Sequence, residues 1–172
     1  MTVCAAPAPA RTRTRMRAPA RGFALIELLI SVVILGLLAS GAMTFADLAV
    51  QRNNEQELRT SLREIRQAID AYKRASDDKR IARAIDETGY PRNLEELTDG
   101  VPDITTPKAT KIYFLRRLPR DPLADPALPA ADTWGLRSYA SSADEPQPGR
   151  DVFDVYSKST RKGLNGQPYG KW

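Results

Sequence analysis

The fold is decided by the stretch GFALIE at positions 22–27, followed by LLISVVILGLLASGAMTFA at positions 28–46. The second part holds nineteen consecutive residues without a charged side chain. As a helix it would be about 29 Å long, close to the ~30 Å hydrocarbon thickness of a membrane. Its apolar residues would surround the helix on every side, which predicts a membrane span rather than an amphipathic helix. Glu27 lies at its start, where an ionisable group is costly and indicates a function.

The excess basic charge of the chain lies entirely before this stretch. The 172 residues include 26 Lys and Arg against 21 Asp and Glu, and five arginines but no acidic residue precede Gly22. The rest of the chain is therefore neutral, with 21 residues of each sign, which argues against nucleic-acid binding. Positive charge before an apolar span predicts a cytoplasmic N-terminus and export of the C-terminal part.

Residues 1–22 are rich in alanine, proline and arginine, and we expect them to act as a processing signal. Three alternatives stay open: a mitochondrial-type presequence, a secretory signal peptide cut after Ala39 or Gly41, and a plain single-pass anchor. The apolar run is longer than that of an ordinary signal peptide. Neither a signal peptide nor an anchor explains Glu27.

The side-chain inventory excludes much enzymology. The chain has no histidine, and its single cysteine, Cys4, lies in the basic leader. Ser-His-Asp and Cys-His catalysis are therefore excluded, as is a zinc site built from the usual ligands. The acidic pairs 77–78 and 95–96 leave a membrane-anchored enzyme or binding domain as a remote alternative, although such pairs usually belong to a solvated surface. We predict no catalytic residue.

The helix is expected to continue beyond the apolar stretch, from Phe23 to about Ala75, because no proline occurs between Phe23 and Tyr90. Past Asp47 the apolar residues recur at 4-3-4-3 spacing, which predicts a seam that packs on a small domain. The seam consists of Leu58, Leu62, Ile65, Ile69 and Tyr72. On the other faces the i,i+4 spacing predicts the ion pairs Glu55–Arg59, Arg66–Asp70 and Asp70–Arg74.

The remaining chain predicts short elements joined by Pro-rich loops. Residues 76–88 are strongly charged and would either extend the helix or form an inserted loop. A short helix is expected over 91–97, ended by Asp99-Gly100. Candidate strands cover 111–115, 136–140 and 151–157, and their shortness predicts a small antiparallel sheet laid against the long helix.

Positions 22–27, with their continuation through position 40, resemble the class III signal of type IV pilins and type II secretion pseudopilins. Later motifs appear in the order found in the major, G-type pseudopilin. They are AIDAYK at 68–73, GYP at 89–91, FLRRLPRDP at 114–122, Trp134-Gly135, Tyr139 and the terminal Trp172. The resemblance covers nearly the whole chain after Gly22, with insertions around 76–88 and 124–133.

The resemblance implies that a prepilin peptidase cuts after Gly22 and methylates the new amine of Phe23. It also implies that Glu27 neutralises this amine in an adjacent subunit. A pair within one subunit, or a carboxylate that reaches the headgroups, stays open. The small residues Gly36 and Ser40 would let helices approach closely during assembly. Many members of the family carry proline where this chain has Thr44.

The implied fold is α+β and pilin-like: one long N-terminal helix packed on a small antiparallel sheet, with a loop-rich C-terminus. The implied organisation is a cleaved leader (1–22), a transmembrane and assembly helix (23–47), its amphipathic continuation (48–75) and a periplasmic domain (76–172). The implied function is that of a structural subunit of a type II secretion pseudopilus, anchored in the inner membrane. A minor pilin of another type IV filament system, for adhesion, motility or DNA uptake, is the alternative.

The implied partners are other copies of the chain, minor pseudopilins, prepilin peptidase, the inner-membrane assembly platform and membrane lipid, without nucleic acid. Major pseudopilins also typically bind calcium in a C-terminal loop, and calcium needs six to eight oxygen ligands. The corresponding loop here, 158–171, contains four basic residues and no carboxylate. We therefore predict no cofactor, with Asp151, Asp154 and Asn165 as the remaining calcium candidates. The other interpretation is a Gly-rich loop held by packing of Tyr169 and Trp172.

Overall fold

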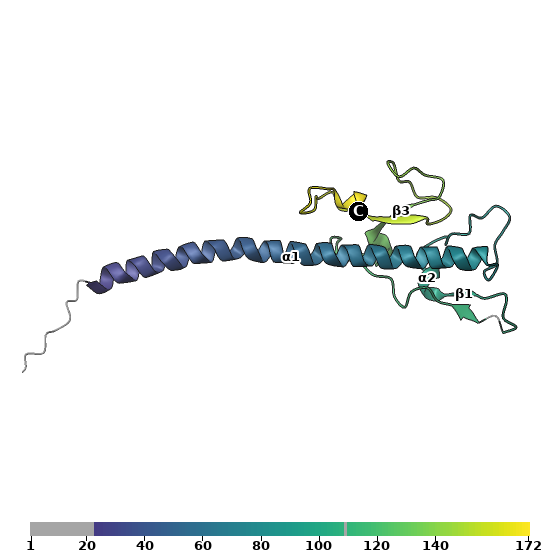
Figure 1. Cartoon of the computed structure of the whole chain (residues 1–172), viewed down its shortest axis with the longest axis horizontal. Helices are drawn as coiled ribbons and strands as arrows, with labels where there is room; N and C mark the ends of the chain where they lie inside the picture. Colours follow the sequence, from purple (N-terminus) through teal and green to yellow (C-terminus); the bar gives the residue numbers. More distant parts are fainter. Residues whose placement is uncertain (1–22, 109) are drawn as a thin grey trace, which may run out of the picture. The chain divides into compact units, whose positions relative to one another are not determined.

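The computed structural model describes residues 23–108 and 110–172, and the side chains at 23–24 and 39–46 lie outside this description. One helix, α1 (Phe23–Asp77), accounts for 55 residues (Figure 1). The chain divides into two compact units between Phe45 and Ala46, inside α1, and each unit is described by itself.

The end of α1 is a capped turn two residues beyond the predicted end at Ala75. Lys79 takes the left-handed conformation, with φ 57°, at a position that usually favours glycine. The amide of Arg80 then donates back to the carbonyl of Ala75 at 2.9 Å. Residues 78–95 therefore form a loop and do not extend the helix.

Short elements follow α1 within the second unit. They are α2 (Glu96–Asp99), β1 (Val101–Pro102), β2 (Lys111–Ile112), the 3-10 turn η1 (Ala131–Thr133), β3 (Trp134–Arg137), β4 (Asp154–Ser157) and the 3-10 turn η2 (Tyr169–Lys171). Strand β1 pairs antiparallel with β2, and β3 pairs antiparallel with β4. The predicted α+β fold, a long helix with small antiparallel sheets, is confirmed.

The predicted boundaries of the short elements differ from the observed ones for local reasons. The expected strand over 111–115 stops at Ile112, because the amides of Phe114 and Leu115 both donate to the carbonyl of Leu97. The expected strand over 151–157 begins only at Asp154, since the amide of Val152 donates to Pro91. β3 begins two residues before the predicted 136–140 and ends at Arg137. Helix α2 covers only Glu96–Asp99 in place of the predicted 91–97, and Gly100, whose φ is 75°, caps its C-terminus.

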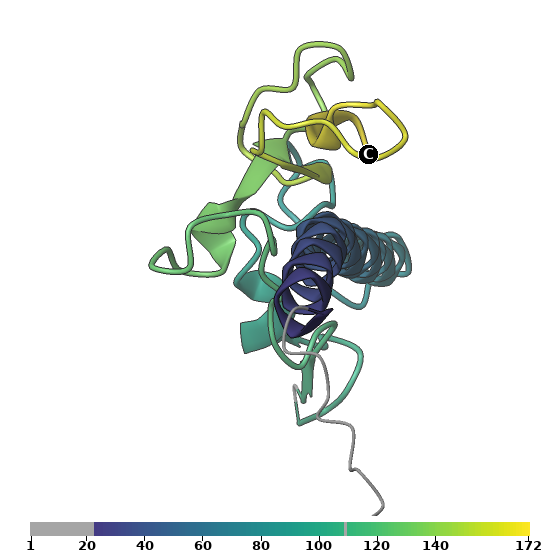
Figure 2. The same cartoon turned by 90° about the vertical axis from the view of Figure 1, so that its left-hand side faces the viewer.

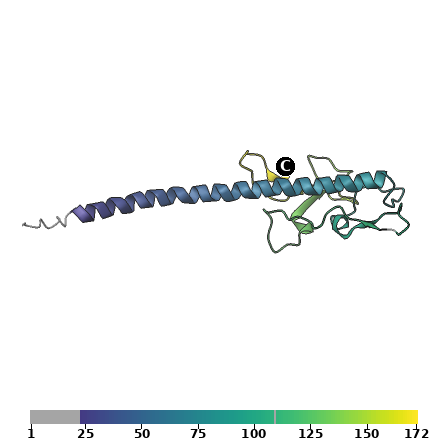
Figure 3. The same cartoon turned by 60° about the horizontal axis from the view of Figure 1, so that its bottom comes forward.

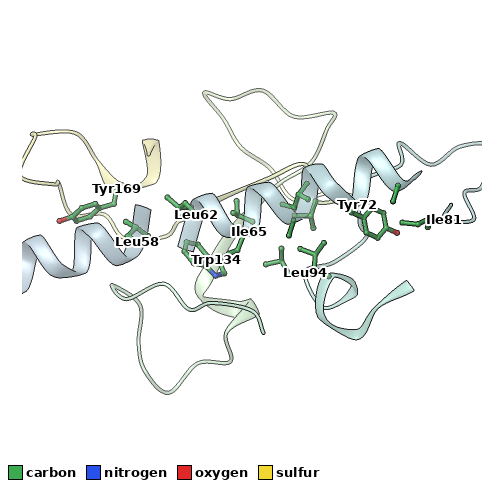
Figure 4. Packing of buried hydrophobic residues seen from close by; sticks show 14 residues of the cluster. Leu58, Leu62, Ile65, Tyr72, Ile81, Leu94, Trp134 and Tyr169 are labelled. Atoms are coloured by element: carbon green, nitrogen blue, oxygen red, sulfur yellow. The ribbon is translucent and has the colours of Figure 1, made fainter. Parts of the chain in front are cut away.

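The core of the second unit lies along one face of α1 (Figure 4). All five residues of the predicted seam are buried, and Leu58 and Ile65 have no exposed surface at all. Later parts of the chain supply the other half of the core, namely Leu94, Leu97, Trp134, Val152, Val155 and Tyr169. Trp134 also donates its indole N–H to the carbonyl of Pro119 at 2.9 Å. Burial of these side chains is the main driving force for folding of the unit.

The segments that cover this core lie on two sides of the C-terminal part of α1. In the turned views, the C-terminal segment lies on one side, and α2 and β1 lie on the other (Figures 2 and 3). Strand β3 contributes Trp134 to the core and pairs with β4, which contributes Val155, so both strands of this sheet pack on the core. The helix is thus the central element of the second unit.

Candidate functional site

The first unit presents an apolar surface without cover from the described chain. Eleven large apolar side chains between Leu25 and Leu38 are 50–69% exposed. They lie on every side of α1, because the sequence there has no polar face. A contiguous apolar surface of this kind marks a contact with a membrane or with another protein.

Glu27 is the single charged residue within this surface and is itself exposed. Its backbone carbonyl accepts a hydrogen bond from the hydroxyl of Ser31 at 2.7 Å. No described residue forms a hydrogen bond or ion pair with its carboxylate. An unpaired carboxylate among apolar side chains needs a partner once the surface is covered.

The other residues predicted for processing and assembly are described only in part. Gly22 lies outside the described residues, as do the side chains of Phe23 and Ser40. A Cβ added at Gly36 would meet no atom within 4 Å, so no packing within the described chain requires a glycine there.

The described residues contain no helix with the length and apolar character that crossing a membrane requires. The predicted span, 28–46, includes positions 39–46, whose side chains lie outside the description. The membrane span thus stays a prediction from the sequence.

The predicted i,i+4 ion pairs of α1 are wrong within the described chain. Arg66 pairs with Asp154 instead of Asp70, and Arg59 lies over the ring of Trp172, 4.3 Å from its centroid. Glu55 accepts hydrogen bonds from the C-terminal segment rather than pairing with Arg59. A helical i,i+4 pair is worth only ~0.2–0.5 kcal/mol, so contacts with the folded domain prevail.

One residue of each acidic pair, 77–78 and 95–96, binds a basic side chain or a backbone amide. Asp77 pairs with Lys73 and lies 3.6 Å from Arg83. Glu96 accepts a hydrogen bond from the amide of Arg92 at 3.1 Å. These contacts are those of a charged surface that stabilises its own loops.

Each of the three calcium candidates binds protein groups. The Asp154 carboxylate lies 2.7 Å from Arg66 and 3.2 Å from Arg137. The Asp151 carboxylate accepts from Thr88 and from the amide of Tyr139, and the Asn165 side chain accepts from the amide of Gln167.

Across the described residues, no three His, Cys, Asp or Glu side chains are grouped so that they could hold a metal ion. Calcium needs six to eight converging oxygens. The donor set of this region therefore does not fit a calcium ion.

Glu55 and Arg66 make contacts that the sequence does not predict. The i,i+4 spacing predicts surface ion pairs for both, yet Glu55 is 7% exposed and both contact residues 158–172. Their partners lie 88–114 residues away in the sequence. The only available signal was that Glu55 lies three residues, and Arg66 one residue, from a buried position of the seam.

Comparisons with known proteins agree with the arrangement at the start of α1. Residues 17–43 match the prokaryotic N-terminal methylation motif. The chain is 26% identical over 140 residues to the type II secretion system core protein G of Klebsiella michiganensis, which covers 78% of this chain and 91% of that protein. No solved structure matches the chain significantly. The chain thus carries the N-terminal methylation motif at residues 17–43 and is similar to core protein G over most of its length.

Proposed function

We propose that the chain is a structural subunit of a type II secretion pseudopilus and polymerises through the N-terminal part of α1 to support protein export. The observation that carries this proposal is the apolar surface between Leu25 and Leu38, which surrounds one exposed carboxylate and coincides with the methylation motif. A membrane-anchored enzyme could use an apolar anchor but would have no need of the carboxylate within it. A filament subunit needs the surface both before and after assembly.

The apolar surface would first be covered by lipid of the inner membrane. Full burial of a leucine, isoleucine or valine side chain contributes ~1.5–3 kcal/mol, so covering eleven half-exposed side chains contributes on the order of 10 kcal/mol. The basic residues before Gly22 would hold the N-terminus in the cytoplasm. The second unit would then lie in the periplasm.

Assembly within the membrane requires a different driving force, because lipid is as apolar as leucine. Close packing of helices and pairing of charges remain. Cleavage after Gly22 would create an amine at Phe23, and this amine in one subunit would pair with Glu27 in its neighbour. The pair removes two charges from an apolar environment, so it would favour one register between subunits.

We assign the chain a structural role and no catalytic one. The partners proposed are further copies of the chain, minor pseudopilins, the prepilin peptidase and the inner-membrane assembly platform. The similarity to core protein G supports a type II secretion system over other type IV filament systems.

The N-terminal mass of the protein from a membrane fraction tests this proposal. We expect the chain to begin at Phe23 and to carry one additional methyl group. An intact Met1, or cleavage after Ala39 or Gly41, would contradict the proposed processing. Blocking the prepilin peptidase should leave the precursor uncut in the same membrane fraction.

A further inference from the structure

Several side chains of α1 contact the C-terminal segment, which we define as residues 158–172, and Glu55 and Arg66 make the hydrogen bonds considered first. The carboxylate of Glu55 accepts hydrogen bonds from the amide of Leu164 at 2.7 Å and from the hydroxyl of Tyr169 at 3.0 Å. The side-chain amide of Gln51 donates a third hydrogen bond to the same carboxylate at 3.3 Å. Burial raises the pKa of the Tyr169 hydroxyl, so this group remains a proton donor to Glu55.

Arg66, eleven residues further along the same helix, bridges β4 and the last residue of the segment. Its guanidinium donates to the carboxylate of Asp154 at 2.7 Å, to the carbonyl of Val155 at 3.1 Å and to the carbonyl of Trp172 at 2.8 Å. The planar guanidinium reaches these acceptors through separate nitrogen atoms, Nε and Nη2, whereas a lysine ammonium presents all its donors from a single nitrogen.

Aromatic packing completes the attachment of the segment. The rings of Tyr169 and Trp172 meet edge to face, with centroids 4.9 Å apart. A Cβ added at Gly163 would lie 2.4 Å from the ring of Trp172, so the backbone passes directly against the indole. Arg59 covers the indole ring at 4.3 Å.

The charges of this region oppose a bound cation. The segment carries Lys158, Arg161, Lys162 and Lys171 and no carboxylate. The nearest carboxylate of β4, that of Asp154, is already paired with two guanidinium groups. A divalent ion would have to displace these groups and still lack most of its oxygen ligands.

We propose that Glu55 and Arg66 hold the C-terminal segment in place, and that its folded conformation is independent of calcium. The guanidinium of Arg66 supplies the positive charge at the carboxylate of β4, and the carboxylate of Glu55 supplies the acceptor for the loop. The two side chains form an internal clamp. The proposal concerns the folding of the segment and does not depend on whether the chain assembles into a filament.

Hydrogen–deuterium exchange of the full-length chain in detergent micelles tests the calcium part. Peptides that cover 158–172 are compared in excess calcium chloride and in excess EGTA. We expect the same exchange in both conditions and the same melting temperature. Faster exchange in EGTA, or a higher melting temperature with calcium, would overturn the proposal.

Substitution of Glu55 tests whether its carboxylate holds the C-terminal segment as a hydrogen-bond acceptor. Glu55→Ala leaves the amide of Leu164 without its partner, so exchange in 158–172 should rise at least about fivefold. Glu55→Gln keeps an acceptor oxygen and should exchange close to wild type. The matched control is Glu57→Ala, because Glu57 is exposed on the same helix and contacts no part of the segment. Equal exchange in Glu55→Ala and Glu57→Ala would contradict the clamp.

Arg66→Lys tests the second contact of the clamp, with the exposed Arg74→Lys as its control. Lysine keeps the charge but lacks the planar fork of donors that reaches these acceptors, so exchange in the segment should rise for Arg66→Lys and stay unchanged for Arg74→Lys. Exchange in 94–97, within the core on the other side of α1, reports whether a variant remains folded. Wild-type exchange throughout Arg66→Lys would exclude Arg66 from the clamp.

Discussion

Two regions of α1 carry apolar residues in different patterns and are covered in different ways. Between Leu25 and Leu38 the large apolar side chains lie on all sides and are exposed. Between Leu58 and Tyr72 they recur on one face, and each is buried under later parts of the same chain. The spacing of the apolar residues therefore decides what can bury them. Apolar residues on one face of a helix can pack on a small domain, whereas apolar residues on every face require a membrane or other subunits.

The largest effect is expected from Glu27→Val, which removes the only charge of the apolar region. The variant should still enter the membrane fraction, because its apolar surface is enlarged. Its incorporation into filaments should fall about tenfold or more, since the amine that cleavage is proposed to create at Phe23 of the neighbouring subunit would be left without a partner in an apolar environment. Quantification of sheared filaments against total membrane protein measures this effect.

The control for this prediction is Glu57→Val, which removes an exposed carboxylate from the same helix in the second unit. A similar assembly defect in both variants would mean that charge loss anywhere on α1 is harmful. Normal incorporation of Glu27→Val would exclude the role assigned to this residue.

Ile65→Ala tests the covered region directly. Ile65 has no exposed surface, and deletion of a buried isoleucine side chain typically costs about 2–5 kcal/mol. We expect this loss in the free energy of unfolding, followed by tryptophan fluorescence during urea denaturation in detergent. The matched substitution in the other region, Ile34→Ala, should change this transition by less than about 0.5 kcal/mol. Equal losses would refute the distinction between the two regions.

Gly135→Ala is expected to lower the free energy of unfolding of the second unit, because it disturbs the packing of strands β3 and β4. Gly135 pairs with Tyr156 across β3 and β4, and an added Cβ would lie 2.3 Å from the tyrosine ring. The ring must move, and such overpacking typically costs about 1–3 kcal/mol. Gly36→Ala is the control, because it adds the same methyl group in open space. A Tyr156→Ala background should reduce the penalty at Gly135, and an unchanged penalty would exclude this clash as its cause.

The smallest effect concerns how the ionisation of Asp103 changes the melting temperature of the protein with pH. Hydrogen bonds from Thr105 and from the Arg80 guanidinium lower the pKa of the Asp103 carboxyl to about 2. Because the folded pKa is lowered, this stabilisation is present above the ordinary aspartate pKa and is lost as the pH falls through about 2. Asp103→Asn should therefore melt below the wild type at neutral pH, with a gap that narrows between about pH 4 and pH 2.

The exposed Asp99 provides the comparison for this acid titration. Asp99→Asn should follow the wild-type melting curve at every pH. A constant gap between Asp103→Asn and wild type over the whole range would mean that the ionisation of Asp103 does not contribute.

Features with a regular period could be predicted from the sequence. The five residues of the seam are buried because the 4-3-4-3 spacing places them on one side of a helix. The end of α1 was placed within two residues, although its cap uses Lys79 and not a glycine. The start of the apolar region matches the methylation motif because that motif is short and contiguous.

Features that depend on distant contacts could not be predicted. Strand β2 ends at Ile112, because the amides of Phe114 and Leu115 both donate to the carbonyl of Leu97. Nothing in the sequence indicates this contact. Glu55 and Arg66 have plausible local partners at i+4, but the folded domain offers them buried acceptors and donors instead. Local rules assign such charges to the surface, since they ignore partners nearly one hundred residues away.

The hydrogen bond between Glu55 and Tyr169 also sets the order in which the second unit can fold. These residues are 114 positions apart, so a long loop must close before Tyr169 can cover Leu58 and its neighbours. Closing such loops is entropically costly and slows folding. During synthesis Glu55 therefore lacks its bond to Tyr169 until the C-terminal segment has emerged, whereas Leu94, Leu97 and Trp134 become available to the seam earlier. Under the proposed export of the second unit, this late contact would leave the C-terminal segment unattached until late in the passage across the membrane.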